Sequence, residues 1–351
     1  MSLLLNSSLV KHLQRILPII KHKNISFKNI YPPKTIFKPN HCIPTSIRYI
    51  SLLKYSTTGK SVVFGFSLLG LFGLDDDINS ELKLIDTIKR GLLYLQKDDY
   101  KAFEQTLHDA LKIAYDLQNF DGLTYVYDVL ANGAFMKKDF VNAEKLFVTV
   151  MQRLMSKGGR ENDLNILHIS LKLAKIYEAQ NNFSKCEIGY EYCLKHLEEL
   201  YHKDPENENV LGLYSLSLDA YARYLLNQGH TKKSFVHFHK AYEICVQLNG
   251  EIFEMNVVLL NDLGTLSYIQ GNVEEALNYL NKAAKIGQHL PDMENFSSVY
   301  INLGNIYLKQ GLFKEAEKNC MEGMKNAKRH HYDEGRKEAA HCLEEVKSAM
   351  L

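Results

Sequence analysis

Proline and cysteine are scarce in this 351-residue sequence. It has 7 prolines, five of them before residue 45, so the rest of the chain contains almost no helix breakers. The 6 cysteines are not tightly clustered, which argues against a small disulfide-linked scaffold. Hydrophobic residues make up 46% and charged residues 24% of the chain, as in folded soluble proteins. Because single cores stop growing near ~250–300 residues, we do not expect one compact globule.

Acidic residues are absent from residues 1–74, which contain ten lysines and arginines. The remaining residues, 75–351, therefore hold 32 basic and 41 acidic side chains, a net charge of −9. A folded part with an acidic balance lacks the basic face that nucleic-acid binding requires. We therefore expect no nucleic-acid partner.

The basic, serine-rich N-terminus has the composition of a mitochondrial transit peptide. Its apolar residues are interrupted by Lys11 and Arg15 before Pro18, which predicts a short basic amphipathic helix. A secretory signal needs an unbroken apolar core at this place, so that reading is disfavoured, while a disordered basic arm remains an alternative. We interpret residues 1–55 as the transit peptide.

An uncharged run of fourteen residues, 61–74, follows Lys60. As a helix it would measure ~21 Å, short of the ~30 Å hydrocarbon core of a bilayer. A twenty-residue stretch from Tyr55 is long enough if the Lys60 ammonium reaches the membrane interface. We interpret residues 56–78 as a membrane anchor. The alternative is an apolar helix that packs on the domain that follows.

Residues 79–351 repeat one helical hairpin six times. The second helix of each hairpin carries a set of three residues on one helix face. Position i holds a residue that is usually small, position i+4 a large one and position i+7 a small or medium-sized one. The six sets are Phe103/Leu107/Ala110, Ala143/Phe147/Val150, Cys186/Tyr190/Cys193, Ser234/Phe238/Ala241, Ala276/Leu280/Ala283 and Ala316/Cys320/Gly323. Three positions before each set stand Tyr100, Phe140, Phe183, Thr231, Val273 and Phe313.

Small residues at these positions allow the partner helix to approach, and the large residue fills the space between neighbours. One hairpin buries only one side, so stacking has to complete the core. We predict an all-α solenoid of six helix pairs, closed by a capping helix over residues 333–350 and preceded by a disordered targeting segment and the apolar segment.

This pattern resembles the tetratricopeptide repeat, most closely in the last two pairs, through Gly264 with Ala276 and through Gly304 with Tyr307. The first pair departs from it, because Phe103 stands where a small residue is usual. The steps between pairs are 40 to 48 residues, longer than the 34 residues of the usual repeat. The longest step contains a polar run, 202–209, which we predict to be an exposed loop.

Motifs that carry chemistry are missing from the sequence. It contains no G-x-x-x-x-G-K-[ST], G-x-G-x-x-G, H-E-x-x-H or G-x-S-x-G. Cys186 and Cys193 share a helix face, but both stand at packing positions of the repeat, which favours core thiols over a metal or redox pair. We therefore predict no catalytic, cofactor or metal site, and no enzymatic activity.

The resemblance implies that the first helices of the pairs line a groove that binds an extended peptide or a partner helix. The repeat register places nine polar residues on that side: Asp128, Asn132, Lys172, Lys175, Asp219, Arg223, Asn261, Asn302 and Asn305. The alternative to partner binding, for each residue, is a hydrogen bond inside the solenoid. Arg223 lies four residues after Asp219 on the same helix face, so these two side chains can form an ion pair. We expect Arg223→Glu to leave folding nearly intact and to weaken partner binding. The nine residues do not have the lysine, asparagine and arginine arrangement by which tetratricopeptide carboxylate clamps bind chaperones. We therefore disfavour a chaperone adaptor.

Several stretches resemble more closely the tetratricopeptide repeat protein 19 family of mitochondrial proteins: 107–115, 124–134, 143–147, 169–177 and 218–226. The resemblance implies a protein of the inner mitochondrial membrane that binds assembled respiratory complex III. It also implies a role in clearing proteolytic fragments of the Rieske iron–sulfur subunit, with no catalysis and no cofactor. The main alternative is a general adaptor, for motor cargo or protein import, that shares only the repeat.

Overall fold

The computed structural model describes residues 19–20 and 75–351. The described residues form thirteen α-helices, which are α2 (Asp75–Gln96), α3 (Tyr100–Asp116), α4 (Phe120–Met136), α5 (Phe140–Ser156), α6 (Leu164–Ala179), α7 (Phe183–Lys203), α8 (Glu208–Asn227), α9 (Thr231–Asn249), α10 (Glu254–Ile269), α11 (Val273–Gly287), α12 (Ser297–Lys309), α13 (Phe313–Arg329) and α14 (Asp333–Met350). Two short strands, β1 (Ile19–Ile20) and β2 (Gly158–Gly159), pair antiparallel, with Ile19 opposite Gly159.

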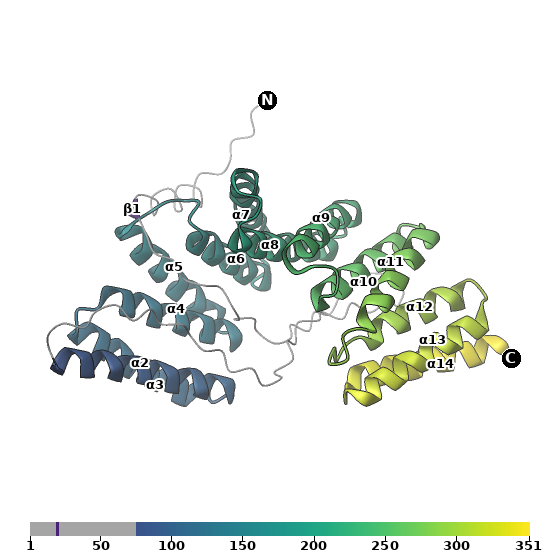
Figure 1. Cartoon of the computed structure of the whole chain (residues 1–351), viewed down its shortest axis with the longest axis horizontal. Coiled ribbons are helices and arrows are strands. Elements are labelled where there is room, and N and C mark those ends of the chain that lie inside the picture. The colour runs from purple at the N-terminus through teal and green to yellow at the C-terminus, as the bar shows by residue number, and fades with distance from the viewer. Residues whose placement is uncertain (1–18, 21–74) are drawn as a thin grey trace, which may run out of the picture. The chain divides into compact units, whose positions relative to one another are not determined.

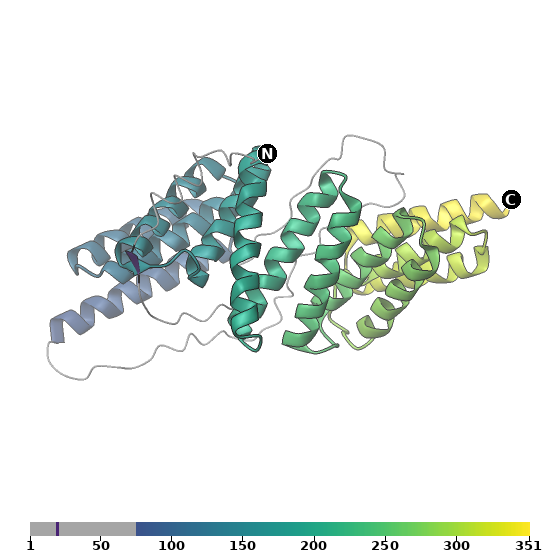
Figure 2. The same ribbon diagram turned by 90° about the horizontal axis from the view of Figure 1, so that it is seen from above.

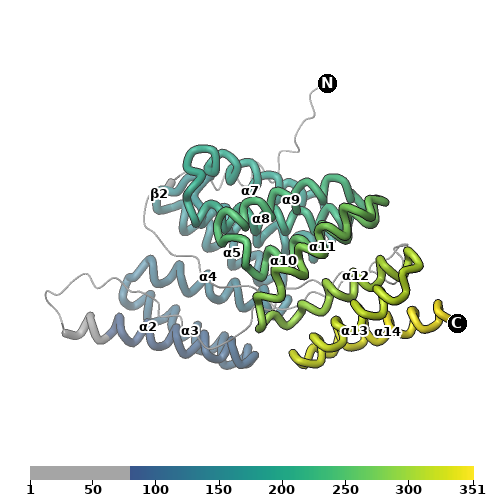
Figure 3. Tube along the Cα trace, turned by 45° about the vertical axis from the view of Figure 1, so that its right-hand side comes forward, coloured from purple at the N-terminus to yellow at the C-terminus, as the bar shows by residue number. Residues whose placement is uncertain are grey.

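The helices form the six predicted hairpins, from α2–α3 to α12–α13, and α14 follows as the capping helix (Figure 1). The described residues divide into two compact units: unit 1 comprises 19–20 and 75–197, and unit 2 comprises 198–351. In unit 1, α2 packs on α3 (Figure 2). In unit 2, α14 packs on α13 and α12 (Figure 3). The prediction of an all-α solenoid of helix pairs is confirmed for this part of the chain.

The predicted register of the second helices is also confirmed. The six residues expected three positions before each packing set are the first residues of α3, α5, α7, α9, α11 and α13. Every member of the six packing sets is buried. The Asp139 carboxylate shows how such a start is stabilised, because it accepts a hydrogen bond from the backbone N–H of Asn142, at 3.2 Å, in the first turn of α5.

The departure of the first pair has a local explanation on α4. Phe103 is 1% exposed although it stands at a small-residue position. Its ring lies against Gly133, where an added Cβ would collide with ring atoms of Phe103. The glycine therefore supplies the space that a small residue on α3 supplies in the other pairs.

Two other predictions have different outcomes. The polar loop is shorter than the predicted run 202–209, because α7 continues to Lys203 and α8 begins at Glu208, which leaves 204–207 between them. The transit peptide, 1–55, and the apolar segment, 56–78, lie outside the described residues except for Ile19–Ile20 and the start of α2. Within the described ranges, every helix is too short or too polar to cross a bilayer.

Candidate partner-binding surfaces

The polar residues predicted in unit 1 come together where α4 meets α6. Asn132 donates to the Asp128 carboxylate at 3.1 Å and to the Asp128 carbonyl at 2.7 Å. The Lys172 ammonium donates to the Asn132 side-chain oxygen at 2.7 Å and lies 5.2 Å from the centroid of the Phe147 ring. We call Asp128, Asn132, Lys172 and Lys175 the unit 1 cluster. It joins two first helices through side chains.

The charges of the unit 1 cluster are unequal. One carboxylate, Asp128, accompanies the ammonium groups of Lys172 and Lys175. Burial lowers the pKa of Lys172, Asp128 raises it, and Lys175 lowers it. Burial also lowers the pKa of the neighbouring His168 well below its ordinary value, and both lysines lower it further. His168 is therefore neutral near pH 7 and adds no charge to the cluster, which contains two lysines and one aspartate.

In unit 2, the predicted polar residues begin at a charged group shared by α8 and α10. The Arg223 guanidinium lies 2.8 Å from an Asp219 oxygen and 2.7 Å from an Asp262 oxygen. It also stacks 5.2 Å from the centroid of the Phe238 ring. The side chains of Asp219 and Asp262 are 3% and 7% exposed, and that of Arg223 is 24% exposed. The arginine thus forms ion pairs with two buried carboxylates at once.

The electrostatics of this group follow from two acids sharing one base. Burial raises the pKa of Asp262 to about 6, although Arg223 lowers it, and Asp219 adds to the increase. Burial also acts to lower the pKa of Arg223, but Asp219 and Asp262 outweigh it and raise the pKa above its ordinary value. The guanidinium is therefore charged at any physiological pH.

Amides continue the polar row toward α12. Asn302 donates to the Asn261 side-chain oxygen at 2.9 Å and to the Thr265 hydroxyl at 3.4 Å. Asn305, one turn further along α12, is 8% exposed. We call Asp219, Arg223, Asp262, Asn261, Thr265, Asn302 and Asn305 the unit 2 cluster. Its members come from the first helices α8, α10 and α12, as the repeat register predicts.

Exposure separates the predicted residues into two classes. Asn132, Lys172, Asp219, Asn261 and Asn305 are buried. The side chains of Asp128, Lys175, Arg223 and Asn302 are partly exposed. The alternative of internal hydrogen bonds is therefore realised by many members, Arg223 included.

Sequence reasoning missed Asp262 and Thr265. Asp262 follows Asn261 on α10 and is not on the position that the repeat register assigns to the groove. A signal was available, because Asp262 stands in an apolar run that the helix buries on most sides. A carboxylate in such a place needs a cation, and Arg223 supplies it.

The thiols of Cys186 and Cys193 are free and buried, as predicted. Burial raises the pKa of both thiols well above the ordinary value. A protonated, buried thiol is a poor nucleophile and a poor metal ligand. Within the described residues, no group of three or more metal-ligating side chains gathers.

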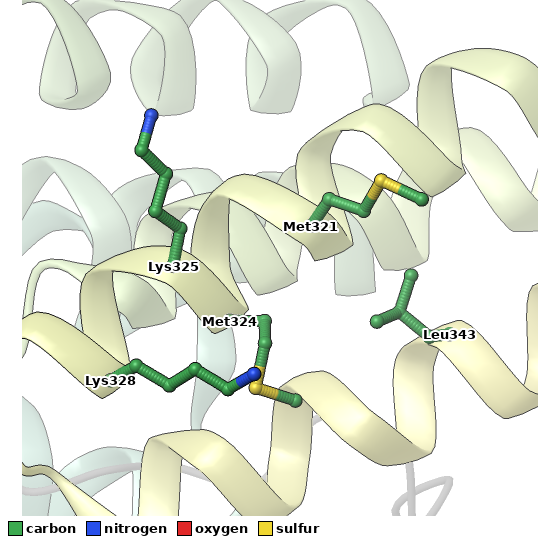
Figure 4. Close-up of a pocket in the computed structure, with 5 residues that line it drawn as sticks. All are labelled: Met321, Met324, Lys325, Lys328 and Leu343. Atoms are coloured by element: carbon green, nitrogen blue, oxygen red, sulfur yellow. The ribbon is translucent and has the colours of Figure 1, made fainter.

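An open pocket of about 350 Å³ lies between α13 and α14 (Figure 4). Three apolar side chains, Met321, Met324 and Leu343, line it together with Lys325 and Lys328. Leu343 comes from α14 and the other four from α13 (Figure 4). None of the five belongs to the predicted partner-binding residues.

Comparison with known proteins identifies the repeat and its relatives. A family model described as tetratricopeptide repeat matches residues 254–329, which cover the two helix pairs that resemble the repeat most closely in sequence. The chain is 34% identical over 284 residues to the mitochondrial tetratricopeptide repeat protein 19 homolog of Drosophila melanogaster, covering 80% of this chain and 77% of that protein. It is also 34% identical over 259 residues to mitochondrial tetratricopeptide repeat protein 19 of Homo sapiens, covering 71% and 68%.

A solved structure supports the fold. The crystal structure of BtubC from P. vanneervenii superposes with a TM-score of 0.55 at 22% sequence identity, covering 67% of this chain and 92% of that one. At this identity the similarity concerns the architecture of stacked helix pairs.

Proposed function

This chain belongs to the tetratricopeptide repeat protein 19 family, and we propose that it is a mitochondrial protein that binds respiratory complex III without catalysing a reaction. The observation that carries the proposal is the 34% identity over 80% of the chain to a relative named as mitochondrial. The complex III role, and with it the clearance of Rieske subunit fragments, is what membership of this family implies. An acid-free basic segment before residue 75 agrees with import into mitochondria.

We propose the same division of the chain as the sequence predicts: a transit peptide over 1–55, an anchor in the inner membrane over 56–78, and a partner-binding repeat domain over 79–351. Anchoring restricts the domain to the membrane that holds its partner, which raises the effective concentration of each for the other. Modest contacts on the repeat domain are then sufficient for stable association.

The partner contacts are assigned to the half-exposed members of the two clusters. Lys175 extends a cluster of two lysines and one aspartate, so it favours an acidic side chain of the partner. Asn302 offers donors and an acceptor, which suit a partner backbone. The Asn261 side chain holds Asn302 in place by accepting its hydrogen bond.

Deletion of the chain tests the function. Cells that lack it should accumulate Rieske subunit fragments and lose complex III activity, and re-expression of the wild-type chain should restore both. Immunoblotting of the fragments and a spectrophotometric assay of the complex are the measurements. Normal fragment levels and normal activity in the deleted cells would reject the proposal.

Rescue with variants tests the surface. Lys175→Glu and Asn302→Ala should be imported and folded but should rescue poorly and recover less complex III by co-purification. The matched controls are Lys145→Glu on α5 and Asn281→Ala on α11, which change the same residue types at exposed positions of second helices. Equal recovery of complex III with all four variants would remove both clusters from the binding surface.

A further inference from the structure

The capping helix α14 is attached to the last repeat by small side chains. Its buried residues are Gly335, Ala339, Cys342 and Val346. The stabilisation from apolar burial scales with the area removed from water, at roughly 25 cal/mol per Å². Four residues of this size bury little area for a helix of 18 residues. Noncovalent packing of α14 therefore depends on these small residues and on the partly buried Leu343.

A disulfide bond joins α14 to α13, between Cys342 and Cys320. Their Cα atoms are 5.9 Å apart, within the range that a disulfide requires. The two residues are 2% and 0% exposed. Gly304 of α12 faces the bond, because a Cβ added there would collide with the Cys320 sulfur and lie 3.1 Å from that of Cys342. Three helices thus meet at this pair of sulfur atoms.

The repeat register shows that this arrangement is specific to the end of the chain. Cys320 occupies the position that fills the space between helices in every pair. In the other five pairs the position holds a large side chain: Leu107, Phe147, Tyr190, Phe238 and Leu280. In the sixth pair the smaller cysteine leaves room, and the sulfur of Cys342 fills it from α14. A covalent bond has taken the place of a bulky core residue.

We propose that the Cys320–Cys342 disulfide is a redox clasp that locks the capping helix onto unit 2 and releases it on reduction. The clasp opens by exchange with a reduced dithiol. One thiolate of the dithiol attacks a sulfur of the bond and displaces the other cysteine as a thiolate, which takes up a proton. The second thiol of the dithiol then resolves the mixed disulfide, so that both cysteines become thiols and the dithiol becomes a disulfide. Burial of both sulfur atoms makes attack depend on outward motion of α14.

Opening of the clasp also affects the pocket between α13 and α14. Met321 and Leu343, which line it, directly follow the two cysteines in the chain. When α14 moves away, Leu343 leaves with it and the pocket loses one wall (Figure 4). The redox state of the pair therefore decides whether this surface exists.

Peptide mapping and amide hydrogen exchange on the full-length chain test the clasp. Free thiols are blocked with N-ethylmaleimide when the protein is isolated, and a peptide linked through Cys320 and Cys342 should appear without reductant. Dithiothreitol should then speed amide exchange in α14 by on the order of 100-fold, as expected for the loss of a disulfide that closes a loop of this size. Exchange in α10 and α11 should remain unchanged.

Variants separate the clasp from a general effect of reductant. Cys342→Ala should show fast exchange in α14 with or without dithiothreitol, whereas Cys245→Ala, which removes a buried free thiol of α9, should keep the full response. The comparison of the wild-type chain with and without dithiothreitol stands even if a variant does not fold. Absence of the linked peptide, or exchange in α14 that dithiothreitol does not change, would overturn the proposal.

Discussion

At the residue scale, Arg223 shows how a partly exposed side chain can also pair with carboxylates of the core. Its guanidinium pairs with two carboxylates from different helix pairs, Asp219 and Asp262. Our expectation that Arg223→Glu leaves folding nearly intact changes for this reason. The substitution would place three carboxylates together, two of them buried, so it tests folding before it tests partner binding.

Substitutions in this group should have unequal costs. Arg223→Met leaves two buried carboxylates without a cation and should lower the free energy of unfolding by about 3–5 kcal/mol. Asp262→Asn leaves one acid with one base, so it should cost far less stability than Arg223→Met. Urea unfolding at pH 7 measures both. If the free energy of unfolding fell by similar amounts in the two variants, the ion pairs between Arg223 and the carboxylates would not be what stabilises this group.

The titration of Asp262 should make the stability of the chain depend on pH. Because its pKa rises from the ordinary 3.8 to about 6 on folding, the folded state binds the proton more tightly than the unfolded state. Its contribution to stability is therefore largest below pH 4 and is lost as the pH rises to about 6, by ~3 kcal/mol at most.

The measurement is the difference in unfolding free energy between the wild-type chain and Asp262→Asn across this pH range. As the pH rises, the wild-type chain should lose stability relative to Asp262→Asn. A difference independent of pH would contradict the assigned shift.

At the element scale, the small residues of each second helix set how closely the helices of a pair approach. Ala276 of α11 is 0% exposed and its carbonyl oxygen lies close to the backbone of Gly264 on α10. No space remains for a larger side chain. The same holds for Ala143 on α5, which is also 0% exposed.

Enlarging one of these residues should overpack its pair. Ala276→Leu or Ala143→Leu should cost about 1–3 kcal/mol of stability through displaced helices. The matched control is Ala340→Leu, on the exposed side of α14, which should be nearly neutral. Differential scanning calorimetry of the three variants is the measurement. Unchanged melting of the first two would show that the assigned register is wrong.

At the scale of the whole molecule, charge is divided along the chain rather than balanced within it. The first 74 residues hold ten basic side chains and no acid, while the rest carries a net charge of −9. A basic segment of this kind is drawn toward the negative side of an energised membrane. The acidic repeat domain has no such attraction.

Residues 1–74 fused to a fluorescent reporter should therefore direct it to mitochondria. The variant Lys11→Gln/Arg15→Gln should reduce import, because it weakens the attraction and leaves the apolar residues unchanged. Microscopy and cell fractionation measure the distribution. A reporter that stays cytosolic in both cases would favour the general adaptor over the mitochondrial protein.

The repeat architecture was predictable because it depends on local spacing. Small and large residues at i, i+4 and i+7 define a helix face, and six occurrences in register predicted six pairs whose second helices begin at the expected residues. The departure at Phe103 was visible in the sequence, but its explanation needed Gly133 of the next pair.

The residues proposed to contact a partner were predictable only as positions on first helices. The register placed Asp219, Arg223 and Asn302 correctly on those helices. It did not predict Asp262, because a contact between residues 39 positions apart depends on how two pairs stack. Spacing within a helix also does not show which polar residues become buried.

Composition and periodicity alone thus determined the class of fold, the number of helix pairs and the contrast between a basic N-terminal segment and an acidic remainder, because each is a property of neighbouring residues. Tertiary structure decided which carboxylates share Arg223, which cysteines bond across α13 and α14, and which amides meet between α10 and α12. The reason is that these contacts join residues of different helices, and their geometry exists only after the helices have packed.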